Sequence, residues 1–276
     1  MYIPQEKYLR TVKAELQQRL NIISQWNIQP GSRILEIGCG QGDSIVILAN
    51  LVGEEGHVTG VDPAPLDYGD PFTVAQVHAN LKSSALGPRI TFEQATLQEH
   101  LESNPDTQYD YAIFTHCLWY FGSPEELNPM LASLRGRAKR LLIAEFSLDA
   151  RGDRTTVPHL LATLAQGEES SRVAGVNYDS NIRSLHTPIS IKKAASEAGW
   201  VLDKESYVDN PPEALDGRRE VQAVLSKEYE KGIACEPDEI RRRFAEALVE
   251  ALKAAIDSLG PGEEVRTMSS WLGCFA

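Results

Sequence analysis

The chain has 276 residues, of which 42% are hydrophobic, and this is enough to bury the core of one elaborated domain. Its 27 Lys and Arg stand against 39 Asp and Glu, and the formal charge of −12 repels a phosphate backbone, which argues against nucleic acid as a substrate. The start of the chain shows no basic segment leading into an apolar one, and no stretch is long enough to span a bilayer. We expect a soluble cytoplasmic protein with no nucleic-acid or membrane partner.

The four cysteines, Cys39, Cys117, Cys235 and Cys274, show no Cys-x-x-Cys pair and no metal-ligand spacing with histidine. They are expected to be free thiols in a reducing compartment, and no metal site is predicted. The composition leaves the oligomeric state open.

The N-terminal part of the chain predicts a strand–turn–helix–strand unit. A helix is expected over about residues 6–26, where apolar residues recur at helical spacing, and Pro30-Gly31 then breaks the chain. A strand at 33–37, a glycine-rich turn, an apolar helix at 44–51 and a strand at 57–62 follow. This order is typical of a parallel sheet.

The same alternation continues with two interruptions. Further elements are expected as a helix at about 73–84, strands at 89–93 and 109–114, a helix opening at Ser123-Pro124, a strand at 140–146, a helix from Thr187-Pro188 to Gly199, and a sixth strand from Trp200. Between them, 148–186 mixes polar loop with a short helical patch, and about 211–262 is largely helical. We expect one domain over 1–276, divided into an N-terminal helix (1–30), a cofactor-binding core (31–147), a cap insertion (148–186) and the C-terminal part of the core (187–276).

A glycine-rich turn follows the first strand and opens the next helix: Glu36-Ile37-Gly38-Cys39-Gly40-Gln41-Gly42-Asp43. Its glycines let the backbone bend sharply and approach a ligand without a Cβ in the way. Asp62, twenty residues beyond Gly42, ends the second strand, where its carboxylate can accept hydrogen bonds from two ribose hydroxyls. Together the turn and the acid predict a nucleoside cofactor.

Asp43 decides between two kinds of nucleoside cofactor. The dinucleotide fingerprint G-x-G-x-x-G requires its third glycine at position 43, where an acid disfavours a pyrophosphate. A ligand with no phosphate and with a positively charged sulfonium and amino group suits Glu36 and Asp43 better. The predicted cofactor is therefore S-adenosylmethionine.

These residues resemble the class I S-adenosylmethionine-dependent methyltransferases, whose first motif E-x-G-x-G-x-G matches Glu36 to Gly42 at every fixed position. The resemblance covers roughly 26–146. It implies a Rossmann-like α/β core, with a mostly parallel seven-stranded sheet flanked by helices and with helical cap insertions. It also implies a methyltransferase, with a small molecule as the expected acceptor.

The resemblance assigns cofactor contacts residue by residue. Asp62 is expected on the ribose, Pro63 beside the adenine, and Thr115 and His116 beside the methionine portion. At Thr96 the family usually has an acid that accepts from the adenine amino group, and a threonine hydroxyl can still accept. The expected cofactor-binding residues are Glu36, Gly38, Cys39, Gly40, Asp62, Pro63, Thr96, Leu97, Thr115 and His116.

The acceptor site is expected under the cap insertion, with the helical insertion after Pro211 as a second wall, because ligands of open parallel sheets gather beyond the carboxyl ends of the strands. The expected substrate-binding residues are Trp119, Tyr120, Tyr178, Arg183 and His186. If the acceptor is a hydroxyl or a protonated amine, a base must remove a proton, and the candidates are His116, His159 and His186. A thiolate, neutral amine or activated carbon needs no base. A decorative loop is the alternative to a substrate cap.

Two other functions remain open from the sequence. One is a methyltransferase-like chain that binds the cofactor without transferring methyl, as a regulator or a non-methylating catalyst. The other is a nicotinamide oxidoreductase on a related fold, against which Asp43 argues.

Overall fold

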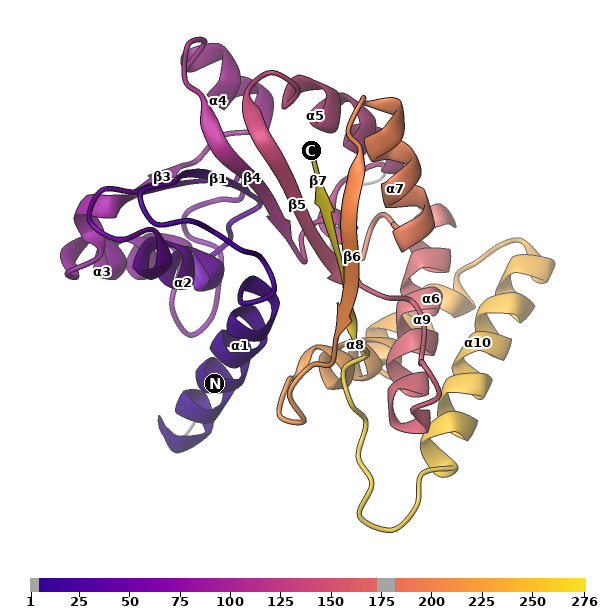
Figure 1. The fold of residues 1–276 in the computed structure, drawn as a ribbon. Helices are drawn as coiled ribbons and strands as arrows, with labels where there is room; N and C mark the ends of the chain where they lie inside the picture. Colours follow the sequence, from indigo (N-terminus) through magenta and orange to yellow (C-terminus); the bar gives the residue numbers. More distant parts are fainter. Residues whose placement is uncertain (1–4, 173–181) are drawn as a thin grey trace.

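The computed structural model describes residues 5–172 and 182–276. Its centre is one seven-stranded sheet in the order β3-β2-β1-β4-β5-β7-β6 (Figure 1). The strands are β1 (Arg33–Ile37), β2 (His57–Val61), β3 (Ile90–Glu93), β4 (Tyr109–Thr115), β5 (Ala138–Phe146), β6 (Leu202–Val208) and β7 (Ser270–Phe275). Only β7 runs antiparallel to its neighbours in this sheet, between β5 and β6. The expected α/β fold with a mostly parallel sheet is confirmed.

Strands near the middle of the sheet are apolar on both sides because helices cover both faces. In β1, Ile34 packs into one hydrophobic cluster while Leu35 and Ile37 pack into the other. The first cluster contains residues of α1 (Gln5–Ile23) and α2 (Asp43–Val52), and the second contains residues of α4 (Leu97–Ser103), α5 (Leu127–Ser133) and α7 (Pro188–Glu197). The remaining helix of this part, α3 (Val74–Ser83), packs beside β3.

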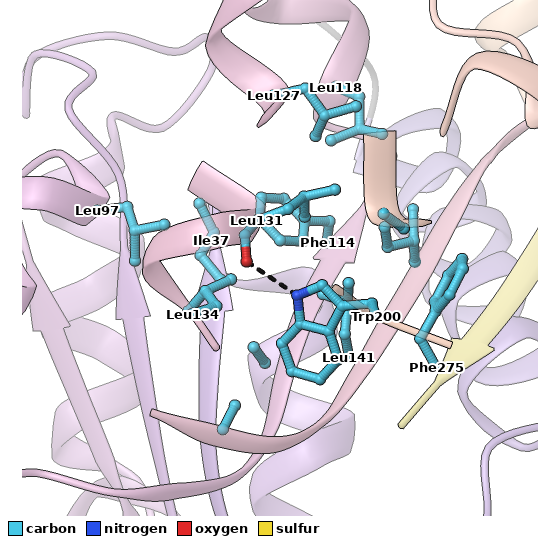
Figure 2. Packing of buried hydrophobic residues seen from close by; sticks show 14 of the residues in the cluster. Ile37, Leu97, Phe114, Leu118, Leu127, Leu131, Leu134, Leu141, Trp200 and Phe275 are labelled. Carbon is cyan, nitrogen blue, oxygen red and sulfur yellow. Dashed lines mark hydrogen bonds between the residues drawn. The ribbon is translucent and has the colours of Figure 1, made fainter. Parts of the chain in front are cut away.

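Trp200 fills the centre of the second cluster (Figure 2). It was expected to open the sixth strand, but β6 begins at Leu202 and Trp200 precedes it. The indole is 2% exposed, and its Nε1 donates to the Leu131 carbonyl at 2.8 Å. The buried N–H is therefore satisfied, which lets a large aromatic ring join a core shared by α5, α7 and the strands.

Four more helices gather beyond the end of β5, at the lower right of Figure 1. They are α6 (Val157–Arg172), α8 (Asp216–Val224), α9 (Lys227–Ala234) and α10 (Glu239–Asp257), and they share a separate hydrophobic cluster. Short 3₁₀ turns complete the described secondary structure at Gly87–Arg89, Leu118–Tyr120, Pro124–Glu126 and Arg154–Thr156.

The expectation of only a short helical patch in 148–186 was wrong, because α6 spans 16 residues. Its buried positions include the polar residues His159, Thr163 and Gln166. The buried face of α6 therefore lacks the apolar periodicity by which a helix is recognised from sequence. One helix was also missed, and the seventh strand of the expected sheet had not been given a position. α4 is short and opens at a Thr-x-x-Glu capping box, while β7 lies at the far end of the chain and is recruited between two earlier strands.

Candidate active site

The turn after β1 presents open backbone at Gly40. Gly38, Gly40 and Gly42 all have positive φ, which residues with a Cβ rarely adopt. A Cβ on Gly38 would lie 2.6 Å from the Cβ of Cys117, whereas a Cβ on Gly40 would meet no atom within 4 Å. The Gly38 N–H donates to the Val61 carbonyl at 2.9 Å. The turn is thus anchored at its start and open to a ligand at Gly40.

Asp62, the first residue after β2, holds its carboxylate against this turn. Oδ2 accepts from the Gly40 N–H and Oδ1 from the Ala64 N–H, both at 2.8 Å. From α3, Nε2 of His78 donates to the Gly40 carbonyl at 2.9 Å, and its ring stacks on Phe92 with centroids 3.6 Å apart. The carboxylate keeps lone pairs for ribose hydroxyls. His78 was not predicted, because a single helical histidine carries no sequence signal of what it faces.

Glu36 places an incompletely bonded carboxyl group in the interior. It is 2% exposed, and its Oε2 has no hydrogen-bond partner among the described residues. Oγ1 of Thr115, at the end of β4, is buried near this carboxyl and acts to lower its pKa, but it has no partner within hydrogen-bond geometry among the described residues. Burial raises the pKa of Glu36 to about 8, although Ser44 and the charge of Arg19 act in the opposite direction. Such a group is costly unless a ligand completes its bonding, and a positively charged ligand favours its ionised form.

His116 is held on both sides just after β4. Its φ of 51° lies in the left-handed region, a strained conformation that concentrates at ligand sites. The Arg19 guanidinium of α1 donates to Nδ1, so the ring proton is on Nε2, which donates to Oγ of Ser270 at 2.8 Å. Burial, and then the charge of Arg19, lowers the pKa of His116 well below its usual range. The neutral ring has no free lone pair for a proton while Arg19 stays there.

Arg19 was not among the predicted site residues. It lies in the N-terminal helix, 97 positions from His116, and only the packing of α1 brings it to the end of β4. The same helix contacts α8, because Nε2 of Gln18 donates to Asp216 at 3.2 Å and Glu15 pairs with Arg219 at 2.8 Å.

Glu145 in β5 is a second buried acid that the sequence analysis did not select. It is 1% exposed, and its carboxylate accepts from the N–H groups of Leu118 at 3.0 Å and Phe146 at 2.9 Å. Burial raises its pKa to about 7 despite these hydrogen bonds. An acidic residue directly after the apolar run at 141–144 was the available signal.

A small cavity lies beside His116 and Glu145, and residues from both insertions help to form its wall. It is lined by His116, Trp119, Tyr120, Glu145, Phe146, His159, Ile182, Asp216 and Glu220.

His159 of α6 brings an unpaired donor to this wall. It is 0% exposed, and its Nδ1 accepts from the Met268 N–H at 3.0 Å, which leaves the proton on Nε2. That Nε2 has no partner among the described residues. Burial lowers the pKa of His159 to about 4, so the ring is neutral near pH 7.

The other predicted substrate residues relate to the cavity in different ways. Trp119 and Tyr120 line it. His186 is buried outside the lining, and its carbonyl accepts from Nε1 of Trp119 at 3.0 Å. Burial lowers the pKa of His186, and its Nε2 has no partner in the described part of the chain. The Arg183 N–H donates to the Trp119 carbonyl at 2.8 Å, and Tyr178 lies outside the described residues.

The residues expected near the adenine have mixed surroundings. Pro63 is exposed beside Asp62. Thr96 is the N-cap of α4, where its hydroxyl accepts from the Glu99 N–H at 3.2 Å and donates to the Glu99 carboxylate at 2.8 Å. Leu97 is 3% exposed in the second hydrophobic cluster. The hydroxyl of Thr96 is engaged in capping, and its contact with adenine stays a prediction.

The predicted free thiols are confirmed, because all four cysteines are unpaired. Across residues 5–172 and 182–276, no group of three or more His, Cys, Asp or Glu residues could hold a metal ion. No helix in the same ranges combines the length and apolar character needed to cross a membrane.

Residues 8–205 match the family model described as a methyltransferase domain. Among curated proteins, methyltransferase phomM of Diaporthe leptostromiformis is 28% identical over 296 aligned residues, which cover 84% of this chain and 75% of the relative.

The solved structures include a cyclopropane-fatty-acyl-phospholipid synthase-like protein from Lactobacillus casei ATCC 334. It is 27% identical, superposes with a TM-score of 0.83, and the match covers 99% of this chain and 94% of that one. Mycolic acid cyclopropane synthase CmaA1, solved with SAH and CTAB, is 14% identical with a TM-score of 0.56 over 95% of this chain and 84% of its own. At that identity the likeness shows the fold alone.

Proposed function

The chain belongs to the methyltransferase domain family and is an S-adenosylmethionine-dependent methyltransferase, and from this premise we propose that its acceptor is a small molecule whose reacting group lies at the small cavity beside His116. The observation that carries the proposal is the position of this cavity. It adjoins the ends of β4 and β5, and it is walled by α6 and α8.

The residues around the glycine turn fit the cofactor. The open backbone at Gly40 and the fixed carboxylate of Asp62 suit a nucleoside, and the Glu36 carboxyl, whose Oε2 has no partner among the described residues, suits a positively charged amino group. The Arg19 guanidinium, which contacts His116, suits the carboxylate of the methionine portion. When bound, S-adenosylmethionine supplies a methyl group on a positively charged sulfur.

Methyl transfer is an in-line displacement, so the protein has to align the acceptor atom, the methyl carbon and the sulfur, and to exclude water. His116 and Glu145 are fixed by hydrogen bonds at the end of the sheet, between the cofactor residues and the cavity. α1 covers this region through Arg19 and Gln18.

The net charge and the unpaired cysteines bear on the kind of acceptor and on the cellular setting. We infer an acceptor that is not a nucleic acid, because the formal charge is −12, and a reducing, cytoplasmic setting, because the four cysteines are unpaired.

Two measurements test the proposal. Calorimetry is expected to show micromolar-range binding of S-adenosylhomocysteine and no comparable binding of NADH, because Asp43 stands where a pyrophosphate-binding turn has glycine. Tighter binding of NADH would overturn the cofactor assignment. Labelled S-adenosylmethionine incubated with the protein and a metabolite extract is expected to yield labelled small molecules. Cofactor binding with no labelled product would instead favour a chain that binds the cofactor without methyl transfer.

A further inference from the structure

Carboxylates dominate the charge of the cavity wall. Glu145, Asp216 and Glu220 all line it, and no lysine or arginine is among the described residues that line it. Arg219, on the same helix as two of these acids, is already paired with Glu15. Arg19 contacts His116 and the side-chain oxygen of Gln18, and it is the residue assigned above to the methionine carboxylate of the cofactor. An anionic acceptor would face like charges in this cavity, whereas a cation would be attracted.

The carboxylates act on other groups of the same wall. Loss of water around the hydroxyl, and then the negative charges of Asp216, Glu220 and Glu145, raise the pKa of Tyr120, although the residue as a whole is 48% exposed. Asp216 likewise favours the charged form of His159, although burial outweighs it. The negative potential therefore reaches both the Tyr120 side and the α6 side of the cavity.

The unpaired donor of His159 is a second, independent sign of a ligand. Its Nε2–H is fully buried in the same wall and has no acceptor among the described residues. Because the Met268 N–H fixes the other nitrogen as an acceptor, the ring presents a donor and not a base. A buried donor without a partner is costly, so a ligand that brings a neutral acceptor atom completes the site.

Aromatic rings form the rest of the wall. Trp119 and Phe146 pack with centroids 5.3 Å apart, and Tyr120 lies next to them in the lining. Aromatic faces attract cations and also cover hydrocarbon. The indole N–H of Trp119 is used on the His186 carbonyl, which leaves this side chain an apolar role in the cavity.

We propose that the acceptor is a small primary or secondary amine that is cationic in solution and carries a neutral oxygen acceptor, such as a hydroxyl, ether or amide oxygen. This inference rests on the proposed function. Asp216 and Glu220 attract the ammonium, the aromatic rings flank it, and the His159 donor binds the oxygen. We expect carboxylic acids and phosphate esters to be poor acceptors, because the acidic side chains of the wall repel anions when they are ionised.

The chemistry needs one proton removed. An ammonium nitrogen has no lone pair, so its N–H bond breaks first and the proton passes to a carboxylate of the wall. The freed electron pair then forms the N–C bond to the methyl carbon while the electron pair of the C–S bond returns to sulfur. The products are a methylated ammonium, a neutral thioether and a carboxylic acid, so charge and atoms balance. Burial raises the pKa of both Glu145 and Glu220, which suits them to hold that proton.

The test uses the whole protein, labelled S-adenosylmethionine and a metabolite extract divided by cation exchange. Labelled products are expected in the retained, amine-containing fraction. Exclusively neutral or acidic labelled products would overturn the amine proposal and leave the methyltransferase intact. No labelled product in any fraction would overturn the proposed function itself, and the amine proposal with it.

Variants give a second readout. They are assayed with an amine whose labelled product was found in the retained fraction. Asp216→Asn and Glu220→Gln should each lower kcat/KM at least tenfold, while the affinity for S-adenosylhomocysteine stays within about twofold. Glu213→Gln, an exposed acid just before the same helix, is the matched control and should behave as wild type. Wild-type kcat/KM in both cavity variants would overturn the assignment of these carboxylates to the ammonium.

Discussion

Asp62 is the residue whose structural surroundings bear most directly on cofactor binding. Its two oxygens already accept backbone N–H groups of Gly40 and Ala64, so the carboxylate is oriented before any ligand arrives. Glu36 and Thr115 add buried polar atoms without partners a few residues away in the sheet. A preoriented acceptor beside incompletely bonded groups is the arrangement expected of a binding site.

Replacing Asp62 by Ala should weaken S-adenosylhomocysteine binding about tenfold to more than a hundredfold, because charge-assisted hydrogen bonds of about 1.5–3 kcal/mol are lost. Calorimetry measures this directly. Asp62→Asn keeps the shape and one oxygen, so its loss should be smaller. An unchanged dissociation constant in Asp62→Ala would mean that the ribose lies elsewhere.

His159 is predicted to act on the acceptor and not on the cofactor. His159→Phe removes the buried donor, and we expect kcat/KM to fall at least tenfold, or about 1.4 kcal/mol of transition-state stabilisation, with cofactor affinity retained. His159→Gln keeps an N–H donor and should recover part of the loss. A parallel fall in cofactor affinity would show that the effect spreads beyond the cavity.

At the scale of elements, helices from three parts of the chain enclose one site. α1 brings Arg19 and Gln18, α6 brings His159, and α8 brings Asp216 and Glu220. Each of these helices buries polar residues on the side facing the site, while its apolar residues pack elsewhere. The polar positions are the reason that α6 escaped recognition from hydrophobic periodicity.

The packing of α5 and α7 on the sheet depends on Trp200. Trp200→Ala removes a ring that is 2% exposed and leaves the Leu131 carbonyl without its donor, so the free energy of unfolding should fall by about 3–5 kcal/mol. Urea denaturation measures the change. Its neighbour Val201 is 68% exposed, and Val201→Ala should change stability by less than about 0.5 kcal/mol. Similar losses in both variants would contradict this account of the core.

At the scale of the whole molecule, two buried acids make stability depend on pH. Burial raises the pKa of Glu36 to about 8 and that of Glu145 to about 7, from an ordinary value of 4.5. Between pH 4.5 and about 8 the folded state keeps protons that the unfolded chain has released. The contribution of these two groups to the free energy of unfolding therefore falls as pH rises through that window.

Urea denaturation of the cofactor-free protein at pH 5 and pH 8.5 tests this sign. Wild type should lose more stability over the interval than Glu36→Gln, which cannot ionise at that position. Glu54→Gln removes an acid whose side chain is 88% exposed and should follow wild type. An equal loss in wild type and Glu36→Gln would show that Glu36 is not protonated in the folded state.

Local sequence was sufficient for the cofactor half of the molecule. A glycine-rich turn between an apolar strand and a helix, followed by an acid-ended strand, is determined by neighbouring residues, and β1, α2 and β2 formed within a residue of their expected bounds. The sheet and the family followed from the same short stretch. Glycine conformation and strand alternation are local properties, so no distant contact is needed to read them.

The acceptor half was decided by tertiary structure. Arg19, Glu145, Asp216 and Glu220 are unremarkable charges in the sequence, and they matter only because α1, β5 and α8 converge on one cavity. The roles of His116 and His159 also depend on which partner occupies each ring nitrogen, Arg19 and Ser270 for one and Met268 for the other. Partners separated by about a hundred residues or more leave no periodic pattern. Burial and pairing, which set charge state and hydrogen-bonding capacity, therefore exist only in the folded chain.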